Sequence, residues 1–538
     1  MKRRWLWFIF LISLSAPFWR LGTPLIEVDD ARYAEVPREM LVLHDWVTPH
    51  LDAMDYVEKP PLWYWLAAAS YEIFGVSEAS ARLPLALLAL LGLLLTYWLG
   101  SWLFSPKTGM TAAILLSASA LYFFLAHYMT LDMALSVFLL GSSAMILRAL
   151  LRPEDARWAA PAAWVFAGLA FLSKGLIALV FPAGWVFFMA LLYPETWRKM
   201  LVFFRPLGIA LFLLIVAPWF VYMEARHPGF FHFFFVDEHF KRFLTMRYER
   251  DQPWFFFLWV IPATLVPVTP AVLAAVPKSW RVWKAKPKEA ALWIWVGMIV
   301  VFFSISHSKL ATYALPVYPY LALLGAAALE ERPAPSWTKR FSAALGALLW
   351  LALAASFFIP AARGFEAPFS LLARGLADAA IAVIGASLIA YGAGLPAVLS
   401  LGAGGLLAWA LALGTMNAAS SFLSVKDVSA AIVRDYKPGD RIDVYDTYFH
   451  GLPFYTGHWV DRIFNWTGEL AYAKKNPADA GRFGSVEEIS RYPLAGRRVF
   501  LVLKKTQISY VRSLVKPGRA SFKSFGPYEL VEFPGKGR

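Results

Sequence analysis

Two adjacent carboxylates, Asp29 and Asp30, follow the first apolar run of this chain and stand close to Arg32 in the stretch DDARYAEVPREML. A carboxylate in such a place can act as a general base, and an arginine beside it can hold an anion by charge-assisted hydrogen bonds. Asp29 could equally be no more than the N-cap of a helix. The chemistry therefore depends on which other polar groups reach the same side of the chain.

A second polar group, Glu58 and Lys59, stands just before Pro60 and Pro61. These prolines suit the first turn of a helix that runs through LWYWLAAASYEIF and ends at Gly75. The free amides and the dipole at a helix N-terminus favour an anion such as a phosphate. A single lysine at a membrane edge can also be a snorkelling side chain without a chemical role.

Other polar residues lie near the ends of apolar segments, where a charge avoids the cost of burial in the bilayer. Asp132, in HYMTLDMAL, could cap the span that follows it. A lone histidine such as His239 is most often satisfied by its surroundings or exposed. The remaining members of this set are Lys174, Glu238, His307 and Lys309.

The composition is that of an integral membrane protein. Of the 538 residues, 59% are hydrophobic and 16% are charged, which is too little polar surface for a soluble globule of this size. The net charge of +14 comes from basic residues in short loops, so it indicates membrane topology and contacts with anionic lipids, and not nucleic acid. The absence of cysteine excludes disulfides and thiolate chemistry.

Apolar segments of about 20 residues each predict about thirteen membrane-spanning helices. We read the first, after Lys2-Arg3-Arg4, as a retained span with its N-terminus in the cytoplasm. The predicted spans lie near residues 5–26, 82–104, 109–128, 132–151, 158–174, 175–193, 201–222, 254–276, 289–306, 311–329, 341–360, 374–391 and 394–415.

With this topology, basic residues gather in the loops on the cytoplasmic side, as the positive-inside rule expects. The candidate residues above all fall on the other side. The long first outer loop, residues 27–81, carries two predicted helices along the membrane: one after Asp29, weakened or restarted at Pro37, and one that begins at Pro60-Pro61. The aromatic loop that contains His239 is expected to rest in the interface.

The composition changes near Ala418, where the long apolar segments end and the sequence becomes typical of a water-soluble domain. A helix-like segment, VSAAIVRDYK, is followed by strand-like RIDVYD, RVFLVLKK and YELVEF. We therefore predict a polytopic α-helical membrane domain over residues 1–417 and a small extracytoplasmic α/β domain over residues 418–538. In a Gram-negative cell, the inner membrane would hold the first and the periplasm the second.

The ordered motifs of this chain resemble those of membrane glycosyltransferases that use polyprenyl-phosphate-linked sugars. This is the GT-C superfamily that includes the protein O-mannosyltransferases, and the likeness is strongest to the family that adds 4-amino-4-deoxy-L-arabinose to lipid A and confers polymyxin resistance. The motifs that carry the resemblance are DDARYAEVPREML, YVEKPPLWYW, MTLDMAL, FLSKG, VDEHFKRF, SHSKLATYALP and GELAYAKKNPADAGRFGS.

The resemblance implies that residues 1–417 are a glycosyltransferase domain, and it implies roles for individual residues. Asp29, Asp132 and Lys59 would be catalytic, with the lysine near the donor phosphate. Glu58 and His239 would share one divalent metal ion, zinc or similar. The substrate-binding residues it implies are Asp30, Arg32, Tyr56, Lys174, Lys309 and Tyr313.

Three departures from the family pattern put the sugar and the acceptor in doubt: His307 in place of Lys, Ala311 in place of Pro, and Asp30 in place of Glu. The expected partners are a sugar on undecaprenyl phosphate, lipid A or another envelope glycan or protein hydroxyl as acceptor, and membrane lipids. We expect a monomer. Displacement of the phosphate would invert the anomeric centre, with Asp29 as base for a hydroxyl acceptor or as an orienting group for a phosphate acceptor.

Two other classes of protein fit parts of the pattern. Many spans with scattered charges also describe a transporter, but here the charges gather at one surface and not at the bilayer midplane. A scaffold would explain the topology but not the convergent acids and bases. The sequence therefore predicts an enzyme.

Overall fold

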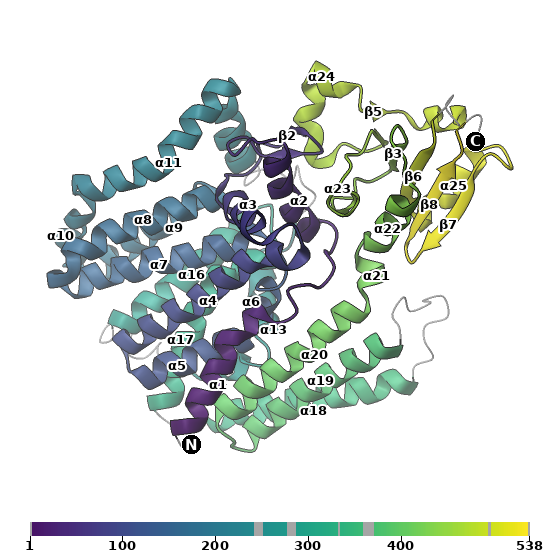
Figure 1. The fold of residues 1–538 in the computed structure, drawn as a ribbon. Helices are drawn as coiled ribbons and strands as arrows, with labels where there is room; N and C mark the ends of the chain where they lie inside the picture. The colour runs from purple at the N-terminus through teal and green to yellow at the C-terminus, as the bar shows by residue number, and fades with distance from the viewer. Residues whose placement is uncertain are drawn as a thin grey trace.

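The computed structural model describes residues 3–241, 251–276, 287–331, 334–358, 371–492 and 497–535. A large helical region makes up most of the molecule, and a small sheet near the C-terminus lies beside one end of it, on the side of helices α2 (Asp29–Val42) and α3 (Leu62–Phe74) (Figure 1). The principal helices of the apolar region are α1 (Arg3–Ser15), α4 (Glu78–Leu103), α5 (Pro106–Ala118), α6 (Ala120–Leu125), α7 (Leu131–Leu151), α8 (Ala156–Lys174), α9 (Ile177–Leu192), α11 (Pro206–Arg226), α13 (Phe256–Thr264), α14 (Thr269–Leu273), α16 (Pro287–Ile305), α17 (Tyr318–Glu331), α18 (Ser336–Phe358), α19 (Leu371–Gly392) and α20 (Gly404–Ala418).

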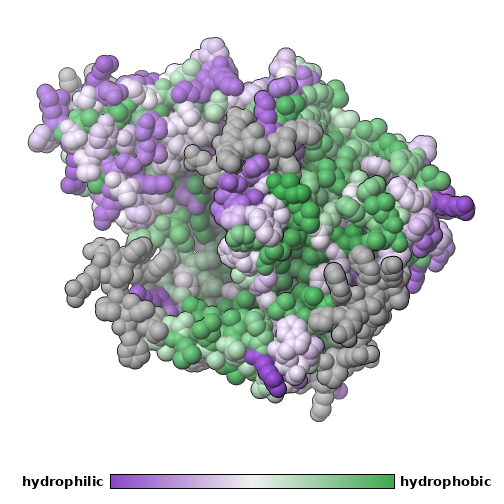
Figure 2. All heavy atoms as spheres, turned by 180° about the vertical axis from the view of Figure 1, so that it is seen from behind, coloured by the Kyte–Doolittle hydropathy of each residue, from purple (hydrophilic) through white to green (hydrophobic). Residues whose placement is uncertain are grey.

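Seven helical stretches in the described portions of the chain are long and apolar enough to cross a membrane. They are Glu78–Leu103, Leu131–Leu151, Pro206–Arg226, Pro287–Ile305, Ala311–Glu330, Leu372–Gly392 and Val398–Ala418. The surface agrees with this composition, since hydrophobic residues cover broad areas of it in Figure 2 and hydrophilic ones gather over the region of the C-terminal sheet. The protein is a multi-pass membrane protein.

Each predicted span contains helix, but two of them divide into two α-helices each. The stretch predicted over 109–128 breaks at Ser119, whose backbone is extended, into α5 and α6. The stretch predicted over 254–276 divides into α13 and α14 around Pro267, which has no N–H to continue the hydrogen-bond ladder. Apolar composition alone does not register these breaks.

The first outer loop forms the two predicted helices, α2 (Asp29–Val42) and α3 (Leu62–Phe74), with a short hairpin of β1 (His50–Leu51) and β2 (Met54–Asp55) between them. α2 continues through Pro37, so the predicted alternative of a restart at this proline is wrong. A proline leaves the carbonyl four residues earlier without its donor, which here is that of Tyr33. The indole N–H of Trp63 in α3 donates to this carbonyl at 2.9 Å, so packing against α3 supplies the missing hydrogen bond.

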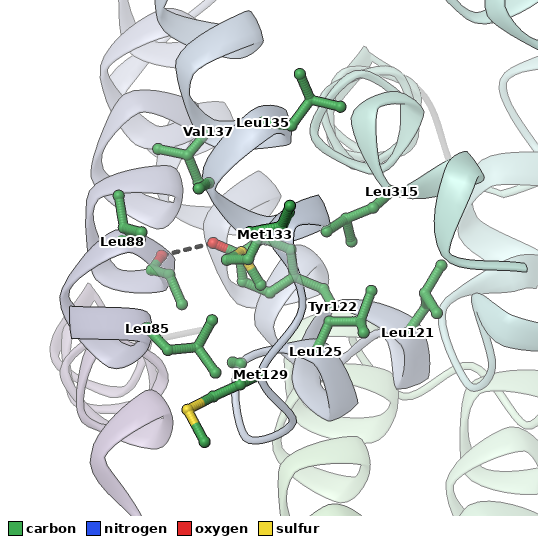
Figure 3. Close-up of a cluster of buried hydrophobic side chains, with 14 of the residues drawn as sticks. Leu85, Leu88, Leu121, Tyr122, Leu125, Met129, Met133, Leu135, Val137 and Leu315 are labelled. Carbon is green, nitrogen blue, oxygen red and sulfur yellow. Dashed lines mark hydrogen bonds between the residues drawn. The ribbon is translucent and has the colours of Figure 1, made fainter. Parts of the chain in front are cut away.

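A buried hydrophobic cluster holds the beginning of α7 against α4 and α6 (Figure 3). Met129 and Met133 lie among leucine side chains from both neighbours, and the Tyr122 hydroxyl donates to the carbonyl of Ala89 at 2.5 Å. The cluster therefore fixes the first turn of α7, which carries Asp132.

A buried ion pair between Asp30 and Arg82 ties the first loop to α4 at 2.5 Å. The Asp30 carboxylate also accepts the backbone N–H of Ile26 at 3.0 Å and that of Met129 at 2.9 Å. Arg82 in turn donates to backbone carbonyls of the segment before Asp30, including that of Leu21 at 2.9 Å. A single pair thus joins three segments: the start of α2, the first turns of α4 and the turn before α7.

The C-terminal region forms a six-stranded sheet in the order β5-β4-β3-β6-β8-β7. Neighbours are parallel from β5 to β6, and β8 runs antiparallel to both β6 and β7. The strands are β3 (Arg441–Tyr445), β4 (Arg462–Phe464), β5 (Phe483–Gly484), β6 (Val499–Lys504), β7 (Ser521–Phe525) and β8 (Tyr528–Phe533). The helices that accompany them include α22 (Lys426–Asp435), α23 (Gly451–Thr456) and α25 (Ile508–Leu514).

Both faces of the central strand β6 are buried, because alternate residues point to opposite sides. Leu501 and Leu503 face a small core with Val511 of α25. Phe500 and Val502 belong to the main core that also contains the first-loop helices. The C-terminal region is therefore packed onto the first outer loop, where α23 contacts α2.

We expect Arg82→Met to lower the free energy of unfolding by roughly 3–5 kcal/mol, because removal of one partner leaves a buried charge uncompensated. Thermal unfolding of the detergent-solubilised protein measures the effect. Lys107→Met is the matched control, since Lys107 forms a largely exposed pair with Glu330. Equal losses in the two variants would contradict the anchoring role of Arg82.

Candidate active site

A cavity of about 1130 Å³ opens between the first loop, the start of α7, the end of α8 and the C-terminal region. Nine residues predicted from the sequence line it, although they come from six separate stretches of the chain. They are Asp29, Arg32, Tyr56, Glu58, Lys59, Asp132, Lys174, His239 and Tyr313. Glu238 lines the same cavity.

Asp29 occupies the first turn of α2 and makes no capping hydrogen bond; the N-cap position is Val28. Its carboxylate instead pairs with the guanidinium of Arg32, one turn along the same helix. The Asp29 side chain is 42% exposed, whereas Asp30 is fully buried. Asp29 is therefore the carboxylate of the pair that a substrate can reach.

Lys59 lies between two carboxylates just before α3. Its Nζ atom is 3.3 Å from Glu238 and 3.8 Å from Glu58. Burial raises the pKa of Glu58 against the opposing attraction of Lys59. An incoming phosphate would compete with both carboxylates for this ammonium group, and the open N-terminus of α3 lies close by in the chain.

Asp132 and Lys174 form a third charged pair at 2.5 Å. Asp132 does not cap α7; Thr130 is the N-cap and accepts the Asp132 N–H at 3.3 Å. Lys174 ends α8 and lies 4.7 Å above the ring of Tyr313. Gly175 follows with a positive φ of 83°, and a side chain there would collide with the ring of His239.

His239 lies in a π-helical segment, η4 (His232–Lys241), of the aromatic loop. Its Nδ1 is 2.6 Å from the carbonyl of Phe234, its Nε2 accepts the backbone N–H of Leu176 at 3.4 Å, and burial lowers its pKa. A neutral imidazole whose Nδ1–H is held by a carbonyl is the form that binds metals, although a metal here would have to displace the Leu176 N–H from Nε2. Within the described residues, however, no three His, Asp or Glu side chains are grouped so as to hold an ion, and Glu58 lies beside Lys59.

Two predicted substrate-binding residues do not line the cavity. The carboxylate of Asp30 is engaged with Arg82 and backbone amides, as described above. Lys309 is buried, donates to the carbonyl of Gln252 at 2.7 Å, and faces a separate hollow of about 660 Å³ that His307 also lines. Its neighbours Ser308 and Leu310 line the main cavity, so the backbone passes the site while the lysine points away.

One wall of the cavity was not predicted from the sequence. Trp466, Gly468 and Glu469 of the C-terminal region line it, and Glu469 accepts a hydrogen bond from Arg32 at 2.5 Å. The stretch that begins GELAYAKK carries some of the family resemblance, which was the available signal, but nothing in its local pattern assigns it to a site 437 residues away.

Comparisons with known proteins identify the family of this chain. Residues 58–222 match the family described as dolichyl-phosphate-mannose-protein mannosyltransferase. A relative from Pseudomonas paraeruginosa, named undecaprenyl phosphate-α-4-amino-4-deoxy-L-arabinose arabinosyl transferase, is 31% identical over 385 residues, which is 69% of each chain. The chain belongs to this arabinosyl transferase family. The resemblance predicted from the motifs is confirmed.

Another arabinosyl transferase, from Pectobacterium atrosepticum, is 35% identical over 314 residues, and that alignment spans 55% of the relative's length. The crystal structure of ArnT from Cupriavidus metallidurans bound to undecaprenyl phosphate has a TM-score of 0.85 with 25% identity, and the match covers 99% of this chain and 98% of that one. Archaeal oligosaccharyltransferase AglB from Archaeoglobus fulgidus shares the fold more distantly, with a TM-score of 0.55.

The predicted divalent ion at Glu58 and His239 can be tested by its removal. If these residues hold an ion, elemental analysis of the purified protein should find a metal that His239→Ala loses. His232→Ala is the matched control, because His232 is exposed in the same helix. Equal metal content in the wild type and in His239→Ala would remove this site.

Proposed function

We propose that this chain is an inverting glycosyltransferase that moves an aminoarabinose-type sugar from undecaprenyl phosphate to lipid A. The names of the relatives point to this donor and sugar. The observation that carries the proposal is the convergence of carboxylates and cations from distant stretches of the chain in one cavity. A sugar phosphate needs both kinds of group, since a base or orienting acid serves the acceptor and cations serve the leaving phosphate.

One side of the cavity suits the lipid portion of such a donor. Apolar side chains from membrane helices α7, α9 and α16 line it, including Leu135, Ile177, Val180, Phe302 and Phe303. A polyprenyl chain could therefore leave the charged end of the cavity along this apolar side without exposing its hydrocarbon to water. The donor is amphipathic, and so is the cavity.

In the reaction, an acceptor oxygen attacks the anomeric carbon from the side opposite the phosphate. The bond from that carbon to the phosphate oxygen breaks, and the phosphate leaves with the electron pair. Arg32 and Lys59 are placed to stabilise its charge, and Lys174 is held nearby by Asp132. For a hydroxyl acceptor, the proton passes to the exposed carboxylate of Asp29.

We also propose the finer topology predicted from the sequence: about thirteen crossings, a cytoplasmic N-terminus, and residues 418–538 as an α/β domain in the periplasm of a monomer. The ends of α7 and α8 support this orientation. Asp132 and Lys174 lie in the cavity, while Arg148 and Arg157 lie at the opposite ends of the same two helices. Basic residues at that end indicate the cytoplasmic side.

Mass spectrometry of lipid A tests the proposed substrates together. Cells that lack this chain should lose an aminopentose from lipid A, and expression of the wild type should restore it. Expression of Asp427→Asn, which changes an exposed helix residue that does not line the cavity, should restore it as well. Unchanged lipid A, with a sugar missing from another glycan, would contradict the proposed acceptor.

Asp29→Asn separates the two possible classes of acceptor. With a hydroxyl acceptor we expect activity to fall about 10²- to 10⁴-fold, because the general base is lost. With a lipid A phosphate the loss should be much smaller, since such a group, with a second pKa of about 6, is already ionised at pH 7. Initial rates of the purified enzyme with each acceptor make the comparison. Equal losses with both would show that Asp29 has the same role for each.

A further inference from the structure

Glu469 is a cavity carboxylate that the mechanism above does not use. It lies in a short helical turn, η7 (Gly468–Ala471), of the C-terminal region. The Nη1 atom of Arg32 donates to its Oε1, while Nη2 of the same guanidinium donates to Asp29. One cation is thus shared by two carboxylates from opposite walls of the cavity.

The cavity lining contains more carboxylates than cations. Its described lining contains five Asp and Glu side chains and three Lys and Arg side chains. Asp132 is paired with Lys174, and Glu58 and Glu238 both lie beside Lys59. If a phosphate draws Arg32 toward itself, the carboxylate of Glu469 loses its cation. A positively charged group of the substrate could then pair with this carboxylate.

The position of Glu469 is fixed by its neighbours. Trp466 lines the cavity beside it and stacks on the buried ring of Tyr448, with ring centroids 5.7 Å apart. Gly468 lies between them with a positive φ of 39°, and a side chain there would collide with the indole. Burial opposes ionisation of Glu469, but Arg32 and His450 outweigh it and hold its pKa below the ordinary value. The group is therefore a rigid carboxylate at neutral pH.

We propose that Glu469 recognises the ammonium group of the donor sugar and that Trp466 supplies the flat face against which the sugar ring lies. The inference rests on the proposed function, because it takes the donor to be an amino sugar on a polyprenyl phosphate. When the phosphate binds Arg32, Glu469 loses the guanidinium as its partner. The ammonium group of the sugar would then replace the guanidinium as the cation that pairs with Glu469. The C-terminal region would thus select the sugar, while the first loop performs the transfer.

The test compares two donors that differ in one group. The purified full-length protein in proteoliposomes receives undecaprenyl phosphate carrying either the amino sugar or its hydroxyl analogue. We expect wild-type kcat/KM to favour the amine by about 10- to 100-fold, the range typical of a hydrogen bond to a charged group. Glu469→Gln should lose most of this preference by slowing the amino donor alone.

Two further variants control for folding and for charge. Glu487→Gln, at an exposed position of the same region, should keep the wild-type preference. Glu469→Asp keeps the charge on a shorter side chain and should retain some of the preference, so it stays informative if Glu469→Gln is poorly folded.

Three outcomes would overturn the inference. An equal loss with both donors in Glu469→Gln would show that Glu469 only positions Arg32. A wild type without preference for the amine would refute recognition while leaving glycosyl transfer intact. Failure of the wild type to use either donor would refute the proposed function itself, and the inference with it.

Discussion

The buried pair of Asp30 and Arg82 is the constraint on which the site depends. It is formed away from the cavity, yet it determines where two cavity carboxylates stand. Asp29 precedes Asp30 directly, and the N–H of Met129 that binds Asp30 lies three residues before Asp132. Because side chains of adjacent helix residues point about 100° apart, anchoring Asp30 inward turns Asp29 outward into the cavity. Removal of the anchor would therefore disturb the chemistry without touching a reacting group.

A second set of contacts joins the C-terminal region to the same loop, and again acidic residues make it. The carboxylate of Glu27 accepts the backbone N–H of Gly451 at 2.7 Å. Asp52 pairs with Arg482 at 2.6 Å and accepts the N–H of Val460 at 2.8 Å. With the pair of Arg32 and Glu469, these contacts hold the C-terminal region against the first outer loop. These contacts explain why the sheet is packed on the first outer loop and is not connected to the membrane helices only through the end of the last span.

Local patterns predicted much of this arrangement. Asp29, Lys59, Asp132 and Lys174 were identified because they lie at the ends of apolar segments. Once the spans are counted, these ends fall on the same side of the membrane. The end of α3 at Gly75 followed from cap chemistry, whereas its start was predicted slightly early, because Pro61 is the N-cap and not a first-turn residue. The sequence did not predict side-chain orientation. It does not tell which of two neighbouring carboxylates faces the protein interior, and we therefore predicted Asp30 as a substrate-binding residue.

Long-range pairing was the other limit. Lys309 was expected in the cavity, but its donation to Gln252 turns it to the neighbouring hollow. Glu469 was not considered, because its contact with Arg32 joins residues more than four hundred positions apart. Pro37 was expected to weaken or restart α2, and the hydrogen bond from Trp63 of α3 explains why the helix does not restart there. Each error concerns a tertiary contact that overrides a local rule.

Photo-cross-linking tests most directly the claim that one cavity, walled by both regions, receives the donor. Undecaprenyl phosphate carrying a small photoreactive group in place of the sugar would be irradiated with the reconstituted full-length protein, and the labelled peptides would be mapped by mass spectrometry. We expect labels in the stretches 56–59 and 466–469, competed by unmodified undecaprenyl phosphate. Labels confined to the hollow beside Lys309, with none in those two stretches, would contradict the assignment of the site.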